Sequence, residues 1–317
     1  MNRRIAFLFP GQGAQYVGMG QSLHKKKTPG ARELFEEAAD VLGYDLKKIM
    51  FEGPEETLKQ TVHTQPAILL HSVAVARALA AEGLKPDFAA GHSLGEYSAL
   101  VSAGALPFSD ALKVVKVRAE SMQRAGEERP GTMAAIMGLD TDKVRKACEK
   151  GSKAGIVQPA NYNAPDQIVI SGQKKGVDAA SEACKKAGAK RVIPLKVHGA
   201  FHSPLMEGAV EPLRHHLRQA SIGQARSPVV SNVTARPAVR PEEIRELLGL
   251  QIIYPVRWFE SMQELDRMGT TFYVECGPGT VLRGLLKRIL ENAPAGGADQ
   301  AEEIGAAVEA ANQGGEA

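Results

Sequence analysis

Short apolar runs and longer amphipathic stretches follow one another along the first part of the chain. Residues 5–9 are all apolar and end at Pro10, which predicts a buried strand that runs into a glycine-rich loop. Residues 31–42 and 65–81 have the pattern of helices, and residues 87–91 are typical of a short strand followed by an apolar helix. This order predicts an α/β domain.

The pattern changes between residues 130 and 197. We expect a strand, a helix, two strands, a helix and a last strand over residues 131–139, 141–150, 156–163, 167–171, 174–187 and 191–197. Thr141 is expected to cap the first of these helices and Gly188 to end the second. The order βαββαβ is that of a ferredoxin-like unit, so residues 129–197 are predicted to form an inserted small domain.

After residue 197 the pattern returns to that of the larger domain, which we assign to residues 1–128 and 198–290. The elements predicted in its second part cover residues 228–232, 241–248, 258–268, 271–275 and a helix ending at Leu290. Residues 291–317 are dominated by Ala, Gly and Glu and contain no aromatic residue. We expect them to be a disordered tail whose removal leaves activity and melting temperature nearly unchanged.

Composition narrows the class of protein. The 317 residues, 44% of them hydrophobic and 24% charged, fit two folded domains of about 150 residues each. The three cysteines, at 148, 184 and 276, form no paired motif, which disfavours a disulfide scaffold or zinc site and favours a reducing compartment. The apolar run at residues 5–9 is too short for a signal peptide or a membrane span. We expect a cytoplasmic protein.

The net charge of +3 is unevenly distributed along the chain. Residues 291–317 contain six acidic residues and no Lys or Arg, so residues 1–290 carry a net charge of +9. This excess suits an acidic or phosphate-bearing partner, although a mixed surface that leans positive would give the same value. The basic run at residues 25–27 is too short to indicate nucleic-acid binding.

The glycine-rich loop at residues 11–15 does not match a nucleotide-binding loop. The dinucleotide fingerprint requires a glycine where Tyr16 stands, and the Gly-Lys pair of a Walker loop does not follow.

A candidate nucleophile lies where the strand at residues 87–91 turns into a helix. Gly91-His92-Ser93-Leu94-Gly95 matches G-x-S-x-G, and strand–turn–helix is the setting of the nucleophile elbow in α/β-hydrolase-like domains. The Leu94 N–H would meet an oxyanion at the start of the helix. An ordinary glycine turn can have the same sequence.

Ser93 needs a general base from a remote segment, because the side chain of the adjacent His92 diverges from it on a tight turn. The candidates are His24, His63, His71, His198, His202, His215 and His216. His202 directly follows the inserted domain, in Gly199-Ala200-Phe201-His202, where a loop can bring it to the elbow. A structural, hydrogen-bonded histidine is the alternative for this position.

Arg118 lies on an apolar helix face. In the helix predicted at residues 109–124 it shares that face with Val114, Val115 and Met122. An unpaired buried guanidinium is costly by several kcal/mol, so Arg118 needs a partner. A protein carboxylate or an anionic ligand would serve, and a planar guanidinium suits a substrate carboxylate.

Six parts of the chain, taken together, resemble the malonyl-CoA:acyl carrier protein transacylase family, which is close kin of the polyketide synthase acyltransferase domains. They are Phe9 to Gln15, Thr64 to Ala67, Gly91 to Tyr97, Arg118, Gly199 to His202 and Glu275 to Gly279. Their order and spacing are those of the family over residues 3–290. The combination is far more specific than any one of its motifs.

The resemblance implies transfer of a malonyl group from malonyl-CoA to the phosphopantetheine thiol of an acidic acyl carrier protein, for fatty-acid synthesis. Ser93 would attack the thioester while His202 takes its proton, and a malonyl-serine ester would form. The N–H groups of Gln12 and Leu94 would form the oxyanion hole, and Arg118 would bind the malonyl carboxylate. No metal or redox cofactor is expected. The phosphopantetheine group is carried by the partner protein.

Further positions follow from the same resemblance. A backbone carbonyl at Gln251 would orient His202. Phe201 resembles the bulky residue of malonyl-selecting enzymes, and exclusion of an α-methyl group by such a wall is worth ~1–3 kcal/mol. The positions expected near the acyl group and the pantetheine arm are Gln65, His92, Met122, Asn161 and Asn163.

Other functions remain open at this point. A serine carboxylesterase or lipase-type hydrolase would share the elbow, but it has no need for Arg118 on an apolar face. A patatin-like enzyme would carry an Asp-Gly-Gly or Asp-Gly-Ala element, which is absent. A catalytically silent binding module would not need Ser93 with His202. A trans-acting acyltransferase of a polyketide pathway is the alternative to fatty-acid supply, and we expect a monomer that binds neither nucleic acid nor membrane.

Overall fold

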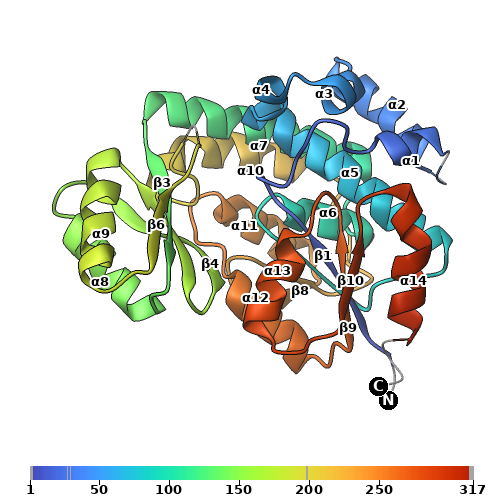
Figure 1. The fold of residues 1–317 in the computed structure, drawn as a ribbon. Coiled ribbons are helices and arrows are strands. Elements are labelled where there is room, and N and C mark those ends of the chain that lie inside the picture. Colours follow the sequence, from blue (N-terminus) through green and yellow to red (C-terminus); the bar gives the residue numbers. More distant parts are fainter. Residues whose placement is uncertain (1–2, 27, 29, 198, 314–317) are drawn as a thin grey trace.

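The computed structural model describes residues 3–26, 28, 30–197 and 199–313. Two sheets organise these residues, one of six strands and one of four. Figure 1 shows the unit built on the smaller sheet lying beside the larger one. Near the two ends of the described chain, Arg3 donates a hydrogen bond to the side chain of Asn312.

The larger sheet has the strand order β10-β9-β1-β2-β7-β8, and its neighbours are parallel except for β7 and β8. The strands are β1 (Ile5–Phe9), β2 (Phe88–Gly91), β7 (Val229–Val230), β8 (Pro237–Ala238), β9 (Phe272–Cys276) and β10 (Ala295–Ala298). Because β1 has β2 on one side and β9 on the other, the loops after these three strands meet at one edge. Ligands bind at such an edge in open parallel sheets.

Side chains of β1 alternate between two cores, as a fully buried strand requires. Phe7 and Phe9 belong to the larger core, and Ala6 and Leu8 belong to the core on the other face. Helices of the larger core include α1 (Gln21–Lys25), α2 (Ala31–Leu42), α3 (Leu46–Glu52), α4 (Glu55–Leu58), α5 (Thr61–Ala81), α6 (Gly95–Ser102), α7 (Phe108–Glu128), α10 (Val210–Gln219) and α11 (Pro241–Gln251). The other face is covered by α12 (Trp258–Arg267) and α13 (Val281–Ile289).

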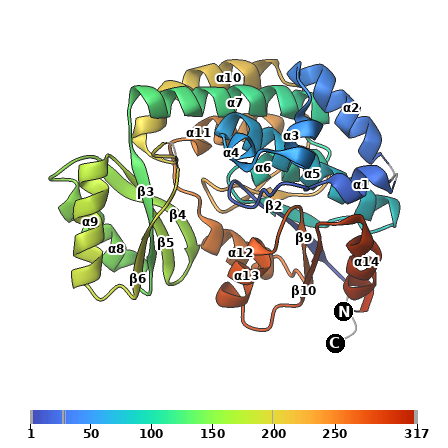
Figure 2. The same ribbon diagram turned by 45° about the horizontal axis from the view of Figure 1, so that its top comes forward.

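The smaller sheet has the order β4-β5-β3-β6 and is antiparallel throughout, as in ferredoxin-like units. Its unit comprises β3 (Thr132–Met137), α8 (Thr141–Gly151), β4 (Val157–Ala164), β5 (Gln167–Gly172), α9 (Lys174–Lys186) and β6 (Arg191–Pro194). Figures 1 and 2 show α8 and α9 on its outer face. The opposite face, which includes Met133 and Val169, joins the larger core. The predicted fold class is confirmed.

Helix α8 begins at Thr141, as expected, but its N-cap is the residue before it. Asp140 is the N-cap, and its carboxylate accepts a hydrogen bond from the Lys143 N–H at 2.9 Å. The prediction that Thr141 caps this helix is wrong, because the short acidic side chain of Asp140 already satisfies that N–H.

The predicted disordered tail over 291–317 is wrong for residues 295–313. Strand β10 pairs with β9, and after the turn η2 (Ala301–Glu303) the helix α14 (Ile304–Gln313) buries Ile304, Ala307 and Ala311 in the larger core. Small residues suit this place, since a Cβ added to Gly297 would lie 2.6 Å from the carbonyl oxygen of Glu275. Residues 314–317 lie outside the described residues. The expectation of a harmless truncation therefore loses its basis.

Among the described residues, none of the helices is both long and apolar enough to cross a membrane.

Candidate active site

The turn between β2 and α6 is sharp and tightly packed. Ser93 has a φ of 51°, in the left-handed region, which costs a residue with a side chain about 1–3 kcal/mol. A Cβ on Gly91 would lie 1.9 Å from the carbonyl carbon of Gly95, and one on Gly95 would lie 2.1 Å from the carbonyl oxygen of Phe9. Glycine at both positions thus lets the turn pack against β1 and present Ser93 at the edge of the sheet.

Asn232, which follows β7, fastens this turn. Its Oδ1 accepts a hydrogen bond from the Ser93 N–H at 2.7 Å, and its Nδ2 donates to the carbonyl oxygen of Gly91 at 2.7 Å. Gln158 on β4 has a similar role beneath His202, because its Nε2 donates to the His202 carbonyl oxygen at 2.9 Å. Sequence analysis missed both residues, since a single amide far along the chain carries no local signal.

Ser93 and His202 meet across the edge of the sheet. The Ser93 Oγ lies 2.8 Å from the His202 Nε2, and the His202 Nδ1 donates to the carbonyl oxygens of Gln251 at 2.8 Å and Tyr254 at 3.2 Å. These carbonyls fix the proton on Nδ1 and leave Nε2 as an acceptor. Burial, followed by the charge of Arg118, lowers the pKa of His202 to about 3. The imidazole is therefore neutral at pH 7 and able to take a proton.

The other histidines have different surroundings. The His92 Nε2 bonds to the Asn163 Oδ1 at 2.8 Å, and the His92 ring packs against Trp258 at 5.5 Å between centroids. Burial lowers the pKa of His92 as well. His198 lies outside the described residues. The rings of the five remaining candidate histidines contact residues other than Ser93. These histidines are His24, His63, His71, His215 and His216.

Arg118 on α7 is buried with 1% of its surface exposed and points at the nucleophile. Its Nη2 donates to the Ser93 Oγ at 3.0 Å and to the Gln251 Oε1 at 3.0 Å, and its Nη1 donates to the Gln65 Oε1 at 2.7 Å. The guanidinium also lies 5.6 Å from the centre of the Tyr97 ring. Burial lowers its pKa. No carboxylate of the described residues lies within 4.0 Å of it, so the partners are neutral amides rather than the carboxylate that the sequence left open.

Glu96, which sequence analysis also missed, lies in the first turn of α6 and is 3% exposed. Its Oε2 accepts hydrogen bonds from the Gln251 Nε2 at 2.7 Å and from the Asn232 N–H at 3.1 Å. Burial raises the pKa of Glu96 to about 7, and these hydrogen bonds oppose the rise. A carboxyl group with this pKa changes charge near neutral pH.

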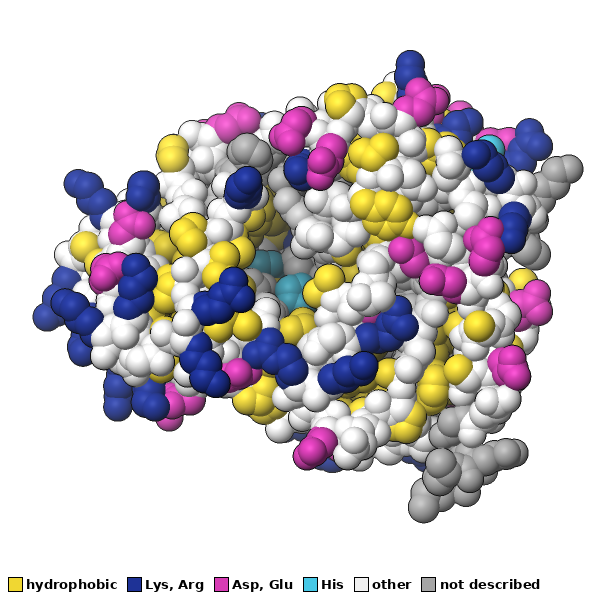
Figure 3. Space-filling view, viewed as in Figure 1, with side chains coloured by type: hydrophobic (Ala, Val, Ile, Leu, Met, Phe, Trp, Pro, Cys, Tyr) yellow, Lys and Arg dark blue, Asp and Glu magenta, His cyan; other side chains and the backbone are white. Residues whose placement is uncertain are grey.

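A cavity of about 120 Å³ opens in front of these groups. Its lining contains Gln12, Gln65, His92, Ser93, Leu94, Arg118, Met122, Met133, Asn161, Leu195, Val197, Phe201 and His202. The predicted residues are thus brought together, except Gln251, which lies beneath Arg118, and Asn163, which binds His92. Figure 3 shows the corresponding hollow between the two units, with histidine side chains visible inside it.

Gln12 and Leu94, whose backbone N–H groups the resemblance assigns to an oxyanion hole, both line this cavity. Gln12 follows β1, and Leu94 immediately precedes α6. Within the part of the chain that the structure describes, neither N–H donates to another protein group. Both can therefore donate to an oxygen that develops negative charge.

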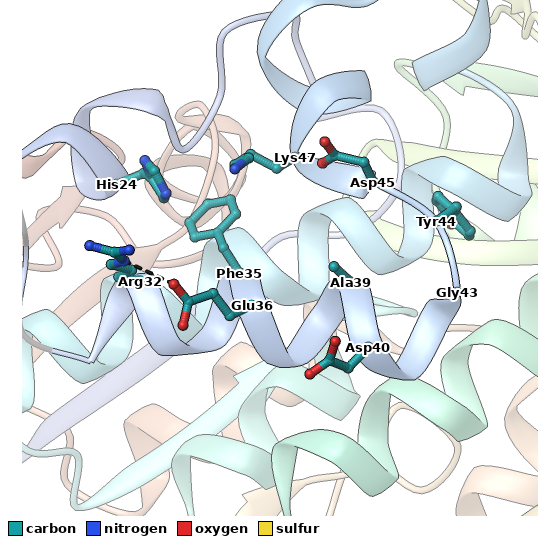
Figure 4. Close-up of a pocket in the computed structure, with 10 residues that line it drawn as sticks. All are labelled: His24, Arg32, Phe35, Glu36, Ala39, Asp40, Gly43, Tyr44, Asp45 and Lys47. Atoms are coloured by element: carbon teal, nitrogen blue, oxygen red, sulfur yellow. Dashed lines mark hydrogen bonds and ion pairs between the residues drawn. The ribbon is translucent and has the colours of Figure 1, made fainter.

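A larger cavity, of about 670 Å³, lies along α2 and carries no comparable arrangement. Figure 4 shows Arg32 and Glu36 paired across its wall at 2.9 Å, with acidic and basic side chains intermingled. The Ser93–His202 pair lies in the smaller cavity, which is the candidate active site.

Comparison with known proteins agrees with this geometry. The family model described as acyl transferase domain matches residues 6–308. The chain is 48% identical to the malonyl CoA-acyl carrier protein transacylase of Bacillus subtilis (strain 168), over 90% of each chain. It is 43% identical to the protein of the same name from Escherichia coli (strain K12), over 96% of this chain and 99% of that one.

Solved structures show the same likeness. A malonyl-transacylase in complex with its type II PKS acyl-carrier protein superposes with a TM-score of 0.92 and 42% identity, covering 96% of this chain and 99% of that one. The malonyl CoA-acyl carrier protein transacylase of Coxiella burnetii gives a TM-score of 0.93 and 40% identity, covering 97% and 98%.

Proposed function

The chain belongs to the acyl transferase family, and from that premise we propose that it transfers a malonyl group from malonyl-CoA to the phosphopantetheine thiol of an acyl carrier protein. The observation that carries the proposal is a buried guanidinium, Arg118, that donates to the hydroxyl of a serine already paired with a neutral histidine. A site that binds an acyl group with a free carboxylate needs this combination.

The first half of the cycle acylates Ser93. Its Oγ attacks the thioester carbonyl carbon of malonyl-CoA while its proton passes to the His202 Nε2. The N–H groups of Gln12 and Leu94 stabilise the oxyanion of the tetrahedral intermediate. When the intermediate collapses, the C–S bond breaks, the coenzyme A sulfur takes the proton from His202, and a malonyl ester remains on Ser93.

The second half reverses these steps with a different thiol. His202 accepts the proton of the phosphopantetheine thiol, the sulfur attacks the ester carbonyl, and Ser93 recovers its proton as the C–O bond breaks. Thioester and ester exchange without any change in oxidation state. The proposed cycle therefore requires no metal or redox cofactor.

Arg118 and Phe201 give the cavity its selectivity in this proposal. Arg118 meets the malonyl carboxylate, since a guanidinium can donate two parallel hydrogen bonds to it. Phe201 lines the cavity and restricts the space for an α-methyl group. Gln65, Met122, Asn161 and His92 complete the wall around the acyl group and the pantetheine arm.

The carrier protein is proposed to be acidic and to dock over the hollow. Residues 1–290 carry a net charge of +9, and Figure 3 shows Lys and Arg side chains around the opening. We propose that the enzyme acts as a monomer. The cysteines are free and buried, as suits the reducing cytoplasm. We propose fatty-acid synthesis as the pathway, with a polyketide carrier as the alternative, because one of the similar structures serves a type II PKS carrier.

A labelling experiment tests the function. Mixing the enzyme with radiolabelled malonyl-CoA should give about one stable label per chain, and adding holo-acyl carrier protein should move that label to the carrier. Ser93→Ala should take up none. Continuous release of free malonate would instead indicate a hydrolase, and the absence of any label on the wild-type enzyme would indicate a binding module.

A further inference from the structure

Glu96 is hydrogen bonded to the side-chain amide of Gln251. An amide has one accepting end and two N–H donors, so its orientation decides what it offers to each neighbour. Here the Gln251 Oε1 faces the Nη2 of Arg118 at 3.0 Å. The two N–H groups on Nε2 face the Ser93 carbonyl oxygen at 3.0 Å and the Glu96 carboxylate at 2.7 Å. Every hydrogen-bonding capacity of the donor end is used.

Burial makes this orientation consequential. Gln251 is fully buried, Arg118 is 1% exposed and Glu96 is 3% exposed, so water does not readily replace a lost partner. A flipped amide would set its N–H groups against the guanidinium and its oxygen against the Glu96 carboxylate, and both contacts are repulsive. An acceptor at position 96 therefore selects the orientation in which Gln251 offers an oxygen to Arg118.

The same carboxylate is also linked to the nucleophile. Its Oε2 accepts the N–H of Asn232, whose side chain accepts the N–H of Ser93. Gln251, in turn, supplies the backbone carbonyl that orients His202. Glu96 is thus hydrogen bonded to both residues that hold the catalytic groups: Asn232, which binds Ser93, and Gln251, which binds His202 and Arg118. It touches none of the reacting atoms.

We propose that Glu96 is a positioning residue for malonyl transfer: by accepting the second N–H of the Gln251 amide, it directs the amide oxygen to Arg118 and holds the guanidinium beside Ser93. This inference rests on the proposed function. A displacement of the guanidinium weakens the interaction with a carboxylate-bearing acyl group more than with a neutral one. The ratio of malonyl to acetyl transfer is therefore the diagnostic quantity.

The test compares two substitutions at position 96. Glu96→Met keeps an unbranched chain without an acceptor, and kcat/KM for malonyl-CoA should fall about 100-fold, with a change within about fivefold for acetyl-CoA. Glu96→Gln keeps an acceptor oxygen and should restore the malonyl-to-acetyl ratio to within about threefold of wild type. A ratio in Glu96→Gln that falls below the wild-type value by much more than about threefold would overturn the proposal, whether or not Glu96→Met folds.

A double-mutant cycle locates the effect. Because Glu96 acts through the Gln251 amide, Glu96→Met combined with Gln251→Leu should be no worse than Gln251→Leu alone, whereas independent effects would add. As a matched control, Glu275→Leu removes another buried carboxylate, whose partners are the N–H groups of Leu282 and Arg283. It should lower the malonyl and acetyl rates equally. An unchanged ratio in folded Glu96→Met would refute the positioning role alone, while absence of malonyl transfer by the wild-type enzyme would refute the proposed function.

Discussion

A buried polar cluster around Ser93 and a half-buried one around Asp299 both involve the loop after β1, and they use their charges differently. The Ser93 cluster comprises Ser93, Glu96, Arg118, His202 and Gln251, and the loop adds Gln12 to its cavity. The Asp299 cluster comprises Tyr16, Ser22, His71, Asp299 and Gln300, and it attaches the C-terminal segment to the rest of the fold. One cluster is built around a cation and the other around a carboxylate.

The charge of Asp299 is fully matched by donors of the protein. Its carboxylate accepts from the Tyr16 hydroxyl at 2.9 Å, the His71 Nε2 at 3.0 Å and the Gly279 N–H at 3.1 Å. Burial acts to raise the pKa of Asp299, but the bond and charge of His71 and the bonds from Gly279 and Tyr16 outweigh it and keep that pKa below its ordinary value. The carboxylate therefore has its partners within the fold itself.

The charge of Arg118 is matched only by neutral oxygens, those of Gln65, Gln251 and Ser93. Its Nε, moreover, has no partner among the described residues. A buried cation without a counter-charge favours an incoming anion, whereas a carboxylate that already has protein donors stabilises the fold. The difference shows how a binding cluster can be told from a structural one when both are rich in hydrogen bonds.

Substitution of the cation should have the largest effect. Arg118→Ala should lower kcat/KM for malonyl-CoA about 10³-fold, because the loss of a buried charged partner costs about 4 kcal/mol. The value for acetyl-CoA, which has no carboxylate, should change less than about tenfold. Steady-state kinetics with both substrates measures the two losses. Equal losses would contradict the role of Arg118 as the carboxylate partner and would make it a structural residue like Asp299.

Substitution of the carboxylate should act on stability instead. Asp299→Ala leaves the Tyr16 hydroxyl and the Gly279 N–H without their acceptor, and the free energy of unfolding in urea should fall by about 3 kcal/mol. The malonyl-to-acetyl ratio should stay at the wild-type value. Glu302→Ala is the control, since its ion pair with Lys26 is half exposed and should contribute less than about 1 kcal/mol. A changed ratio in folded Asp299→Ala would show that the two clusters are coupled.

The features that the sequence could predict are those marked by a local pattern. The βαββαβ insertion and the strands at residues 5–9 and 271–275 follow from local periodicity, and the structure contains them. Ser93 stands in a continuous motif with its own glycines, so its place at the turn was predictable. Arg118 was identified because a charge interrupts an apolar helix face.

The residues that were missed act across long separations. Asn232 reaches Ser93 over 139 positions and Glu96 over 136 positions, and no local pattern marks an amide that braces a turn. The C-terminal segment was missed for a different reason. Its burial depends on Ala and Gly fitting against β9 and α5, whereas a segment of Ala, Gly and Glu without aromatic residues has the composition of a disordered chain.

The smallest change in kcat/KM is expected when the pH is lowered, and this measurement tests whether the buried His202 stays neutral. Burial, followed by the charge of Arg118 on α7 and by the nearby His92, lowers the pKa of His202 to about 3 from the usual value near 6.5. A lowered pKa keeps the imidazole neutral as the pH falls, so the rate should not decline where a free histidine gains its proton. Glu96 titrates near pH 7 in the same cluster, and the measurement therefore uses Glu96→Gln, which cannot titrate there. In that variant kcat/KM for malonyl-CoA should stay constant within about twofold from pH 8 to about pH 5, and a decline with an apparent pKa near 6.5 would show that His202 is solvated in the working enzyme.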